Sequence, residues 1–423
     1  MPLLPRIPPL GEPQLRPLHR VTRSTAERMA DATENLPCVQ GTLSTEWSAL
    51  LTACSSIPCQ EKFDRLQSLL LKPFSWTSLA HLADQHGIAS LLYDSLSPVK
   101  DPAFANEMRL LEQRYRANLH KALFITRELV RILDRLEELS IEVIPYKGVA
   151  LSESMYGEIG LRQTGDIDLL IRPGDWEGVK KAVGELGYAP HMALSKKEEQ
   201  AYLRSGYECA FDSPAGRNLV EVQWALQPRY FSVDFEMDGL FQRTSTVAIA
   251  GRRMKTLSAE DLLLVLSVHA AKHVWRRLLW LCDIAQILKQ PGLNWNWIEE
   301  QAKVLGITRI LKVTLHLANQ LLGSALPALA KSEREDDPSI LALTGEIRAQ
   351  ILSGDFCGPE TLAYFRLMMR LRERRADRMR FLRRLAFTPG PGEWETVCLP
   401  RPLFPLYHLV RLGRLAKRLA RAA

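Results

Sequence analysis

The period of the hydrophobic pattern changes at Ile141, and this change constrains the fold more than any other feature of the chain. Apolar residues recur at helical spacing before this point and again well after it, whereas short β-branched runs, turns and helical segments alternate in between. Asp166–Ile171 is typical of a buried strand, and residues 207–211 with 219–226 are typical of a hairpin. The order strand, helix, strand, helix, hairpin predicts an α+β fold, in which N-terminal and C-terminal helical regions flank a small mixed β-sheet.

We expect the 423 residues to divide into four segments, because a chain of this length exceeds what one compact core usually supports. Residues 1–41 are rich in proline and poor in apolar periodicity, which predicts a flexible tail. Residues 42–140 predict a helical region that ends in a long helix from about 105 to 139. Residues 141–250 form the expected α+β core, and residues 251–423 predict a helical domain with a basic tail.

The composition indicates a soluble globular protein, since 46% of the residues are hydrophobic and 24% are charged. The longest stretch without a charged side chain, residues 313–330, is short and interrupted by polar residues and Pro327, so no transmembrane segment is expected. Prolines among the first 20 residues speak against an export signal. Together with an odd number of cysteines, seven, these features predict a cytoplasmic protein with reduced thiols.

The positive charge is concentrated near the C-terminus. The chain carries a net charge of +7, and the 14 Arg and one Lys after residue 360 outnumber the four acids there. The arginine-rich residues 366–384 form either a solvated helix face or a surface for an anionic partner such as nucleic acid. Weak binding of the basic helix expected at residues 403–419 to an anionic membrane surface is a further alternative.

Two acidic side chains share one face of the strand expected at Asp166–Ile171. Asp166 and Asp168 stand two positions apart, so both point to the same side of the sheet. Carboxylates this close repel each other unless one is protonated or a cation lies between them. Hard oxygen ligands favour Mg²⁺, and Glu221, between Val220 and Val222, adds a third carboxylate if its strand lies beside the first.

Cationic groups precede the acids along the chain. Lys147-Gly148 ends a strand and begins a helix, where backbone N–H groups, a glycine and a lysine together suit an anion such as a triphosphate. Arg162 adds a second cation just before the acidic strand. The sequence therefore predicts a pocket in which cations face a metal-binding cluster of acids, as in-line attack on a nucleotide phosphate requires.

Taken together, these motifs resemble the bacterial family of poorly characterised nucleotidyltransferases in the polymerase-β-like superfamily. The resemblance extends over about residues 45–415, and it implies that Asp166, Asp168 and Glu221 bind two Mg²⁺ ions, with Mn²⁺ as an alternative. It also implies that Lys147, Gly148 and Arg162 hold the nucleotide. Gln223 stands where this family commonly has His, and Val149 follows Gly148 where the superfamily favours a Gly-Ser pair. The motifs that carry the resemblance are Lys147-Gly148, Tyr156-Gly157, Arg162, Asp166-Ile167-Asp168, Val220 to Trp224, His269 to His273, Trp280 to Ile284, Trp394, Leu399-Pro400, Leu406-Tyr407 and Arg411.

The resemblance implies a Mg²⁺-dependent enzyme that moves a nucleoside monophosphate from an NTP, such as ATP or GTP, to the hydroxyl or phosphate of an acceptor. Asp166 and Asp168 are expected to bridge the metal ions, and Glu221 to act as a third ligand or as the general base. A sugar, a peptide or a small metabolite fits as acceptor, in bacterial polysaccharide or modified-peptide biosynthesis, and nucleic acid fits less well. Two alternatives are phosphoryl transfer at the same site and a catalytically silent partner-binding protein.

Two histidines and one acid in the C-terminal half are further candidates for the pocket. His269 and His273 are four residues apart and share a helix face, where they are either packed histidines or line the nucleotide or acceptor pocket. Asp283 lies in an apolar helix and either pairs with a buried partner such as His273 or Arg276 or serves the site.

Overall fold

The computed structural model describes residues 43–422, except for residues 193, 215, 328–337, 359–360, 389–392, 394–396, 398–402 and 404–405. The expected tail of residues 1–41 lies outside the described residues, as do Trp394 and Leu399-Pro400 of the family resemblance. The elements described below all belong to one compact unit, Thr45–Ala423.

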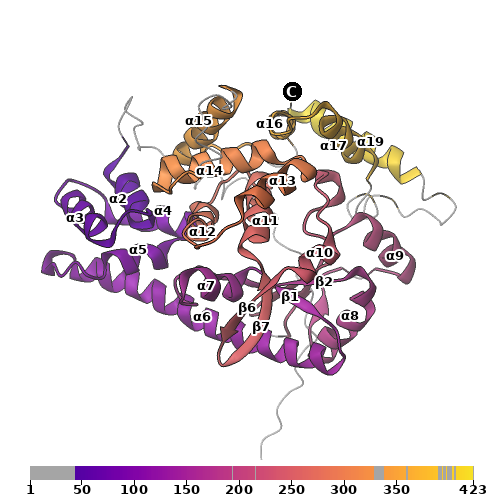
Figure 1. The fold of residues 1–423 in the computed structure, drawn as a ribbon, viewed down its shortest axis with the longest axis horizontal. Helices are drawn as coiled ribbons and strands as arrows, with labels where there is room; N and C mark the ends of the chain where they lie inside the picture. Colours follow the sequence, from indigo (N-terminus) through magenta and orange to yellow (C-terminus); the bar gives the residue numbers. More distant parts are fainter. Residues whose placement is uncertain are drawn as a thin grey trace, which may run out of the picture. The chain divides into compact units, whose positions relative to one another are not determined.

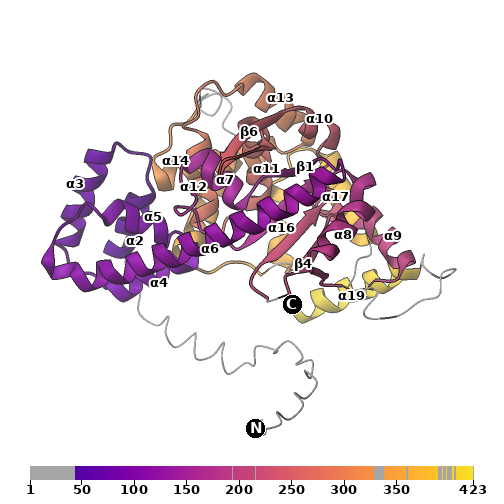
Figure 2. The ribbon, with the colours of Figure 1, turned by 90° about the horizontal axis from the view of Figure 1, so that it is seen from below.

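The first part of this unit is helical, as the sequence predicts (Figure 1). The long helix α6 carries a stripe of buried side chains that includes Ile125, Leu129 and Ile132. This stripe recurs at helical spacing, so α6 presents one apolar face to the sheet region. Seen from below in Figure 2, α6 crosses from the N-terminal helices to α8. The helices are α2 (Thr45–Cys54), α3 (Cys59–Leu70), α4 (Trp76–His86), α5 (Ala89–Leu96) and α6 (Ala105–Glu138).

A mixed five-stranded sheet follows, with the strand order β1-β2-β5-β4-β3. Strands β2 and β5 are parallel, and every other neighbouring pair is antiparallel. This sheet between two helical regions confirms the predicted α+β class. The strands are β1 (Val143–Pro145), β2 (Asp166–Ile171), β3 (Ala189–Pro190), β4 (Glu208–Asp212) and β5 (Leu219–Gln223), and the helices among them are α7 (Gly148–Tyr156), α8 (Trp176–Glu185) and α9 (Lys196–Ser205).

The two faces of the sheet are chemically different. Ile167, Leu169 and Val222 belong to an apolar cluster with α6 and α8 on one face. The alternate residues Asp166 and Asp168 face the other way, because successive side chains of a strand point to opposite sides. The apolar layer therefore leaves the polar side chains of β2 and β5 on the face toward the C-terminal helices.

A second hairpin, β6 (Thr244–Ile249) and β7 (Arg252–Leu257), joins the sheet region to the helices that follow. Its turn, Ala250-Gly251, has positive φ at both positions, which is the conformation that two-residue hairpins favour. The expected boundary at residue 250 falls within this turn. Helix α11 (Ala259–Lys272) then begins where the sequence predicts, since the Ser258 hydroxyl accepts a hydrogen bond from the Asp261 N–H at 3.1 Å.

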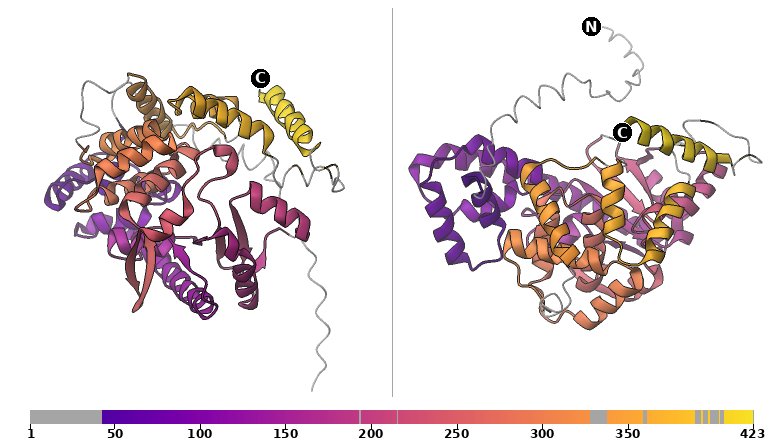
Figure 3. Two further views of the ribbon diagram at one scale, coloured as in Figure 1. Left: turned by 45° about the vertical axis from the view of Figure 1, so that its right-hand side comes forward. Right: turned by 90° about the horizontal axis from the view of Figure 1, so that it is seen from above.

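The C-terminal helices lie on the side of the sheet opposite α6 (Figures 1 and 3). None of the helices in the described part of the chain has the length and apolar character needed to cross a membrane. After α10 (Met237–Gln242) and α11 they are α12 (Leu278–Ile287), α13 (Trp295–Leu305), α14 (Thr308–Leu322), α15 (Pro338–Ser353), α16 (Leu362–Arg370), α17 (Arg375–Phe387) and α19 (Tyr407–Ala422).

Several arginines of the segment 366–384 serve the fold. Arg372 is buried, donates a hydrogen bond to the Met368 carbonyl at 2.6 Å and packs its guanidinium 3.9 Å from the Phe381 ring centre. Arg384 pairs with Asp234 at 2.6 Å. These two contacts do not distinguish a solvated helix face from a surface for an anionic partner such as nucleic acid. Both interpretations of residues 366–384 therefore stay predictions.

Candidate active site

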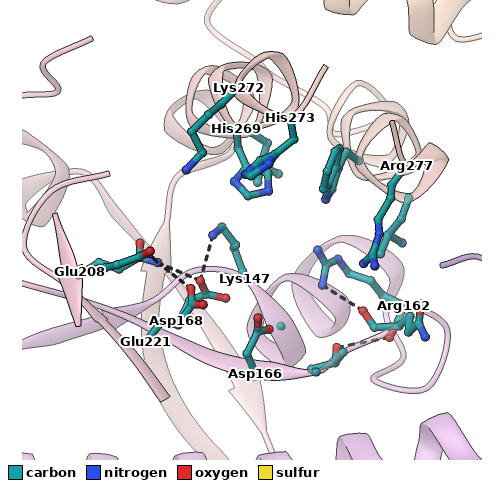
Figure 4. A pocket seen from close by; sticks show the side chains of 18 of the residues that line it. Lys147, Arg162, Asp166, Asp168, Glu208, Glu221, His269, Lys272, His273 and Arg277 are labelled. Atoms are coloured by element: carbon teal, nitrogen blue, oxygen red, sulfur yellow. Dashed lines mark hydrogen bonds and ion pairs between the residues drawn. The ribbon is translucent and has the colours of Figure 1, made fainter. Parts of the chain in front are cut away.

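Strand pairing brings the three predicted acids together. Asp168 on β2 lies directly opposite Glu221 on the parallel strand β5, and Asp166 lies two positions before Asp168 on the same face. All three side chains line a cavity of about 470 Å³ (Figure 4). The β-branched and leucine side chains between them point into the apolar layer on the other face, which fixes the acids toward the cavity.

Lys147 enters the acid cluster from the end of β1. Its ammonium lies 2.9 Å from Asp168 Oδ1, and the Asp168 side chain is only 2% exposed. Burial opposes the charge on Lys147, but the Asp168 carboxylate outweighs this effect and the pKa of Lys147 rises well above its usual value. Lys147 is therefore charged and forms a buried ion pair with Asp168.

The Gln223 amide connects the carboxylates. Its Nε2 donates to Asp168 Oδ1 at 3.1 Å, to Glu221 Oε2 at 3.3 Å and to Glu208 Oε2 at 3.4 Å. Its oxygen accepts a hydrogen bond from the Tyr146 hydroxyl, which fixes the orientation of the amide. Gln223 is 1% exposed, so this amide is buried within the cluster of acids.

Negative charge is in excess here. Burial, followed by the charges of Asp168 and Glu208, raises the pKa of Glu221 to about 8. Burial and then Asp168 also raise the pKa of Asp166. Lys147 supplies one positive charge against these carboxylates, so an added cation would lower the energy of the cluster.

The donor set suits a hard divalent cation, because the three predicted acids offer carboxylate oxygens toward one cavity. Among the residues that the structure describes, however, no three His, Cys, Asp or Glu side chains are arranged to hold a metal ion as they stand. Asp168 Oδ1 is instead engaged by Lys147 and Gln223. The predicted metal ligands therefore stay a prediction.

Gly148 lies beside the acids at the first turn of α7. It has φ +56°, and a Cβ added there would lie 3.1 Å from the backbone oxygen of Asp166. A side chain at this position would be strained and crowded, so the helix start requires glycine. The close approach leaves the N-terminus of α7 bordering the cavity, where an anion would meet backbone N–H groups.

Arg162 also lines the cavity, but its guanidinium is engaged within the protein. Its Nε and Nη2 donate to the two carboxylate oxygens of Asp283 at 2.9 and 3.0 Å, and the Tyr156 hydroxyl donates to the same carboxylate at 2.8 Å. Asp283 thus pairs with a buried partner, as one alternative proposed, but that partner is Arg162 and not His273 or Arg276. The predicted role of Arg162 in holding the nucleotide stays a prediction.

His269 and His273 are both packed and pocket-lining. Their ring centres lie 4.8 Å apart, and each contacts the Trp280 ring, at 5.1 and 5.4 Å. Burial and then nearby lysines lower both pKa values, that of His273 to about 3. The two imidazoles are therefore neutral, and they form one wall of the cavity opposite the acids (Figure 4).

Residues 72–323, more than half of the chain, match the protein family described as uncharacterised nucleotidyltransferase. The chain belongs to this family. The match confirms the predicted resemblance and contains every site residue described above, although we expected the wider span 45–415. No curated protein matches the sequence.

Two solved structures resemble part of this nucleotidyltransferase. The solution structure of the antibiotic-resistance factor ANT(2'')-Ia has 18% identity and a TM-score of 0.32, over 43% of this chain and 89% of that one. The crystal structure of an antigenic nucleotidyltransferase-like protein from Paracoccidioides brasiliensis has 17% identity and a TM-score of 0.30, over 48% of this chain and 95% of that one. These TM-scores are low, so nothing is drawn from either likeness.

The nucleotidyltransferase cavity contains charged residues that the sequence did not single out as site residues. Glu208 on β4 lies opposite Gln223 in the hairpin, and aligning the two strands about their turn would have placed it beside the acids. Lys272 is three residues after His269 on α11. This spacing puts both side chains on one face of the helix, so it could have indicated that Lys272 also lines the cavity. Three further cations line the cavity: Lys121, Arg276 and Arg277.

Proposed function

We propose that this nucleotidyltransferase moves a nucleoside monophosphate from an NTP to a hydroxyl group of an acceptor, with Mg²⁺ as cofactor. The observation that carries the proposal is the pairing of Asp168 with Glu221 across β2 and β5, beside Lys147 and the glycine start of α7. Acids for a metal and donors for an anion thus border one cavity.

Asp166, Asp168 and Glu221 would hold the metal. Their carboxylates offer the hard oxygen ligands that Mg²⁺ prefers, and two ions are the expected number, with Mn²⁺ as an alternative. When bound, the metal would neutralise phosphate oxygens and orient them for in-line displacement.

Lys147 and the first turn of α7 would bind the phosphates. Gly148, the first residue of α7, lines the cavity, and the Lys147 ammonium beside the acids would contact a phosphate oxygen. Neutral His269 and His273 would form the opposite wall and exclude water from the phosphates.

Transfer would proceed by attack of the acceptor oxygen on the α-phosphorus, so that a P–O bond forms to the acceptor and the bond to pyrophosphate breaks. Glu221 would serve either as a third metal ligand or as the group that takes the hydroxyl proton. Burial and the neighbouring carboxylates raise the pKa of Glu221 to about 8, so a bound cation that favours its ionised form would be needed before it could take this proton near neutral pH.

An assay with labelled nucleotides tests this function. Purified protein is incubated with Mg²⁺, a small-molecule extract and each NTP in turn, labelled at the α-phosphate or at the γ-phosphate. We expect α-label to appear on an acceptor, together with release of pyrophosphate. Transfer of γ-label alone would establish phosphoryl transfer instead, and absence of any NTP turnover with every nucleotide would contradict both reactions. The same assay identifies the base, ATP or GTP being expected, and shows whether the acceptor is a sugar, a peptide or a small metabolite.

A further inference from the structure

The cavity has two ends, defined by the order of the strands. Gly148 and α7 belong to the side of β2, where the Gly148 Cα approaches the Asp166 backbone. Glu208 lies on β4, beyond Glu221 on β5 and therefore on the far side of the acids from α7. Figure 4 shows this arrangement, with Glu208 and Lys272 at one end and Asp166 and Arg162 at the other.

If displacement is in line, the NTP and the acceptor must occupy different ends of the cavity. The attacking oxygen and the leaving pyrophosphate must lie on opposite sides of the α-phosphorus. Lys147 and the first turn of α7 are the groups proposed to bind the phosphates. They would hold the triphosphate on the β2 side of the cavity. The acceptor must then approach from the β4 side, where Glu208 and Lys272 line the cavity.

Lys272 brings a positive charge to the acceptor end, where the Glu208 charge acts on it without a direct ion pair in the described part of the chain. Its ammonium lies 4.9 Å from the centre of the Tyr207 ring, and no carboxylate in the described part of the chain forms an ion pair with it. Burial lowers the pKa of Lys272 to about 8, although the Glu208 charge acts in the opposite direction. A cation withdrawn from water in this way is stabilised by an anionic ligand that completes the pair.

Glu208 adds an acid to this end of the cavity. Glu208 receives a hydrogen bond from Gln223 at 3.4 Å and has no ion-pair partner among the described residues, and burial raises its pKa. Leu226 and Leu266 add apolar side chains to the lining of the same cavity. The subsite thus offers one cation and one hydrogen-bonding acid to a small molecule.

We propose that Lys272, Glu208 and Tyr207 form the acceptor subsite, and that the acceptor carries a carboxylate or phosphate group that pairs with the Lys272 ammonium. The proposal rests on the nucleotidyl transfer proposed above. With its anionic group at Lys272, the acceptor places a hydroxyl toward Glu221, and Glu208 accepts a hydrogen bond from a second polar group of the same molecule.

Calorimetric titration of two anions tests the subsite without knowledge of the natural acceptor. The protein is saturated with Mg²⁺ and a non-hydrolysable NTP analogue and is then titrated with inorganic phosphate and, separately, with malonate. Lys272→Met should weaken binding of the preferred anion by about tenfold or more, as expected for loss of a charge-assisted contact. The matched variant Lys181→Met, which alters an exposed lysine on α8 that does not line the cavity, should leave it within about twofold. The two anions distinguish a phosphorylated acceptor from a carboxylated one.

The outcomes separate this inference from the proposed function. Equal anion affinity in wild type and Lys272→Met, including no binding by either, would overturn the acceptor subsite. Loss of affinity for the NTP analogue in Lys272→Met would also overturn it, because Lys272 would then serve the nucleotide. Failure of the wild type to bind any NTP analogue would instead contradict the proposed function itself.

Discussion

The Lys147 ammonium lies 2.9 Å from Asp168 Oδ1, within the cluster of acids that would bind a metal. A divalent ion would need the same carboxylate, so Lys147 and the metal compete for Asp168. Nucleotide phosphates would relieve this competition, because they offer Lys147 another anion. The pair therefore couples metal binding to nucleotide binding in the proposed reaction.

Replacing Lys147 should uncouple metal binding from nucleotide binding. In Lys147→Met we expect Mn²⁺ to bind about tenfold more tightly without nucleotide, because the competing charge is gone, while NTP binding weakens by about the same factor. Free Mn²⁺ is measured by electron paramagnetic resonance, and Lys181→Met, an exposed lysine on α8 outside the cavity, is the control. An unchanged Mn²⁺ affinity in Lys147→Met would show that the lysine does not compete with the metal.

The Gln223 amide should position the acids as a unit. Gln223→Leu keeps most of the volume but removes the donor to Asp168, Glu221 and Glu208. We expect a loss of about 1–3 kcal/mol in the free energy of unfolding, since buried acceptors lose their partner. Gln223→His, which restores a ring N–H, should recover part of this loss. Denaturant unfolding measures both, and a neutral Gln223→Leu would show that the amide contributes nothing to the cluster.

Arg162 and Asp283 form a buried bidentate pair across 121 positions of the chain. Asp283→Asn leaves the guanidinium without its charge partner and should cost about 3 kcal/mol or more of stability. The double variant Arg162→Met/Asp283→Leu should lose less stability than Arg162→Met and Asp283→Leu lose together, because neither charge is left unpaired. Thermal unfolding gives these values. Strictly additive losses would mean that the pair is not coupled, and the NTP affinity of each stable variant reports whether Arg162 also serves the nucleotide.

His86 should make stability depend on pH. It is 4% exposed, its Nδ1 accepts the Leu278 N–H at 3.2 Å, and burial followed by Arg277 lowers its pKa from 6.5 to about 4. The unfolded chain takes up the proton first, so this contribution is complete above pH 6.5 and is lost as the pH falls toward 4.

The comparison with His86→Asn isolates this effect from other titrating groups. The stability difference between wild type and variant should shrink by about 2 kcal/mol between about pH 7 and about pH 4.5, because only the wild type has the histidine to protonate. Unfolding curves across this range measure the difference. A difference that stays constant with pH would contradict the neutral, buried state of His86.

The strands that carry the acids could be predicted from sequence because their pattern is local. Strand β2 has the predicted bounds, Asp166–Ile171, since a buried apolar run ends at a Pro-Gly pair. The β6 and β7 hairpin was not foreseen, because Arg253 and Lys255 alternate with few apolar residues and its turn, Ala250-Gly251, lacks the usual Asn-Gly signal.

Contacts between distant segments explain what the sequence could not show about the site. The partner of Arg162 lies on α12, far along the chain, so its pairing with Asp283 depends on helix packing. Lys147 was expected to face phosphates, and only the folded site shows that it meets Asp168. The presence of Lys272 in the cavity likewise depends on how α11 packs over the sheet.

The most direct measurement is transfer of α-label from the NTP by wild type and by Asp168→Asn. The substitution keeps the size of the side chain but removes the charge that faces Glu221 and Lys147. We predict that transfer falls by at least about 100-fold, whereas Asp212→Asn on the same sheet stays within about twofold of wild type. A folded Asp168→Asn protein that transfers label at the wild-type rate would contradict the assignment of this acid cluster as the active site.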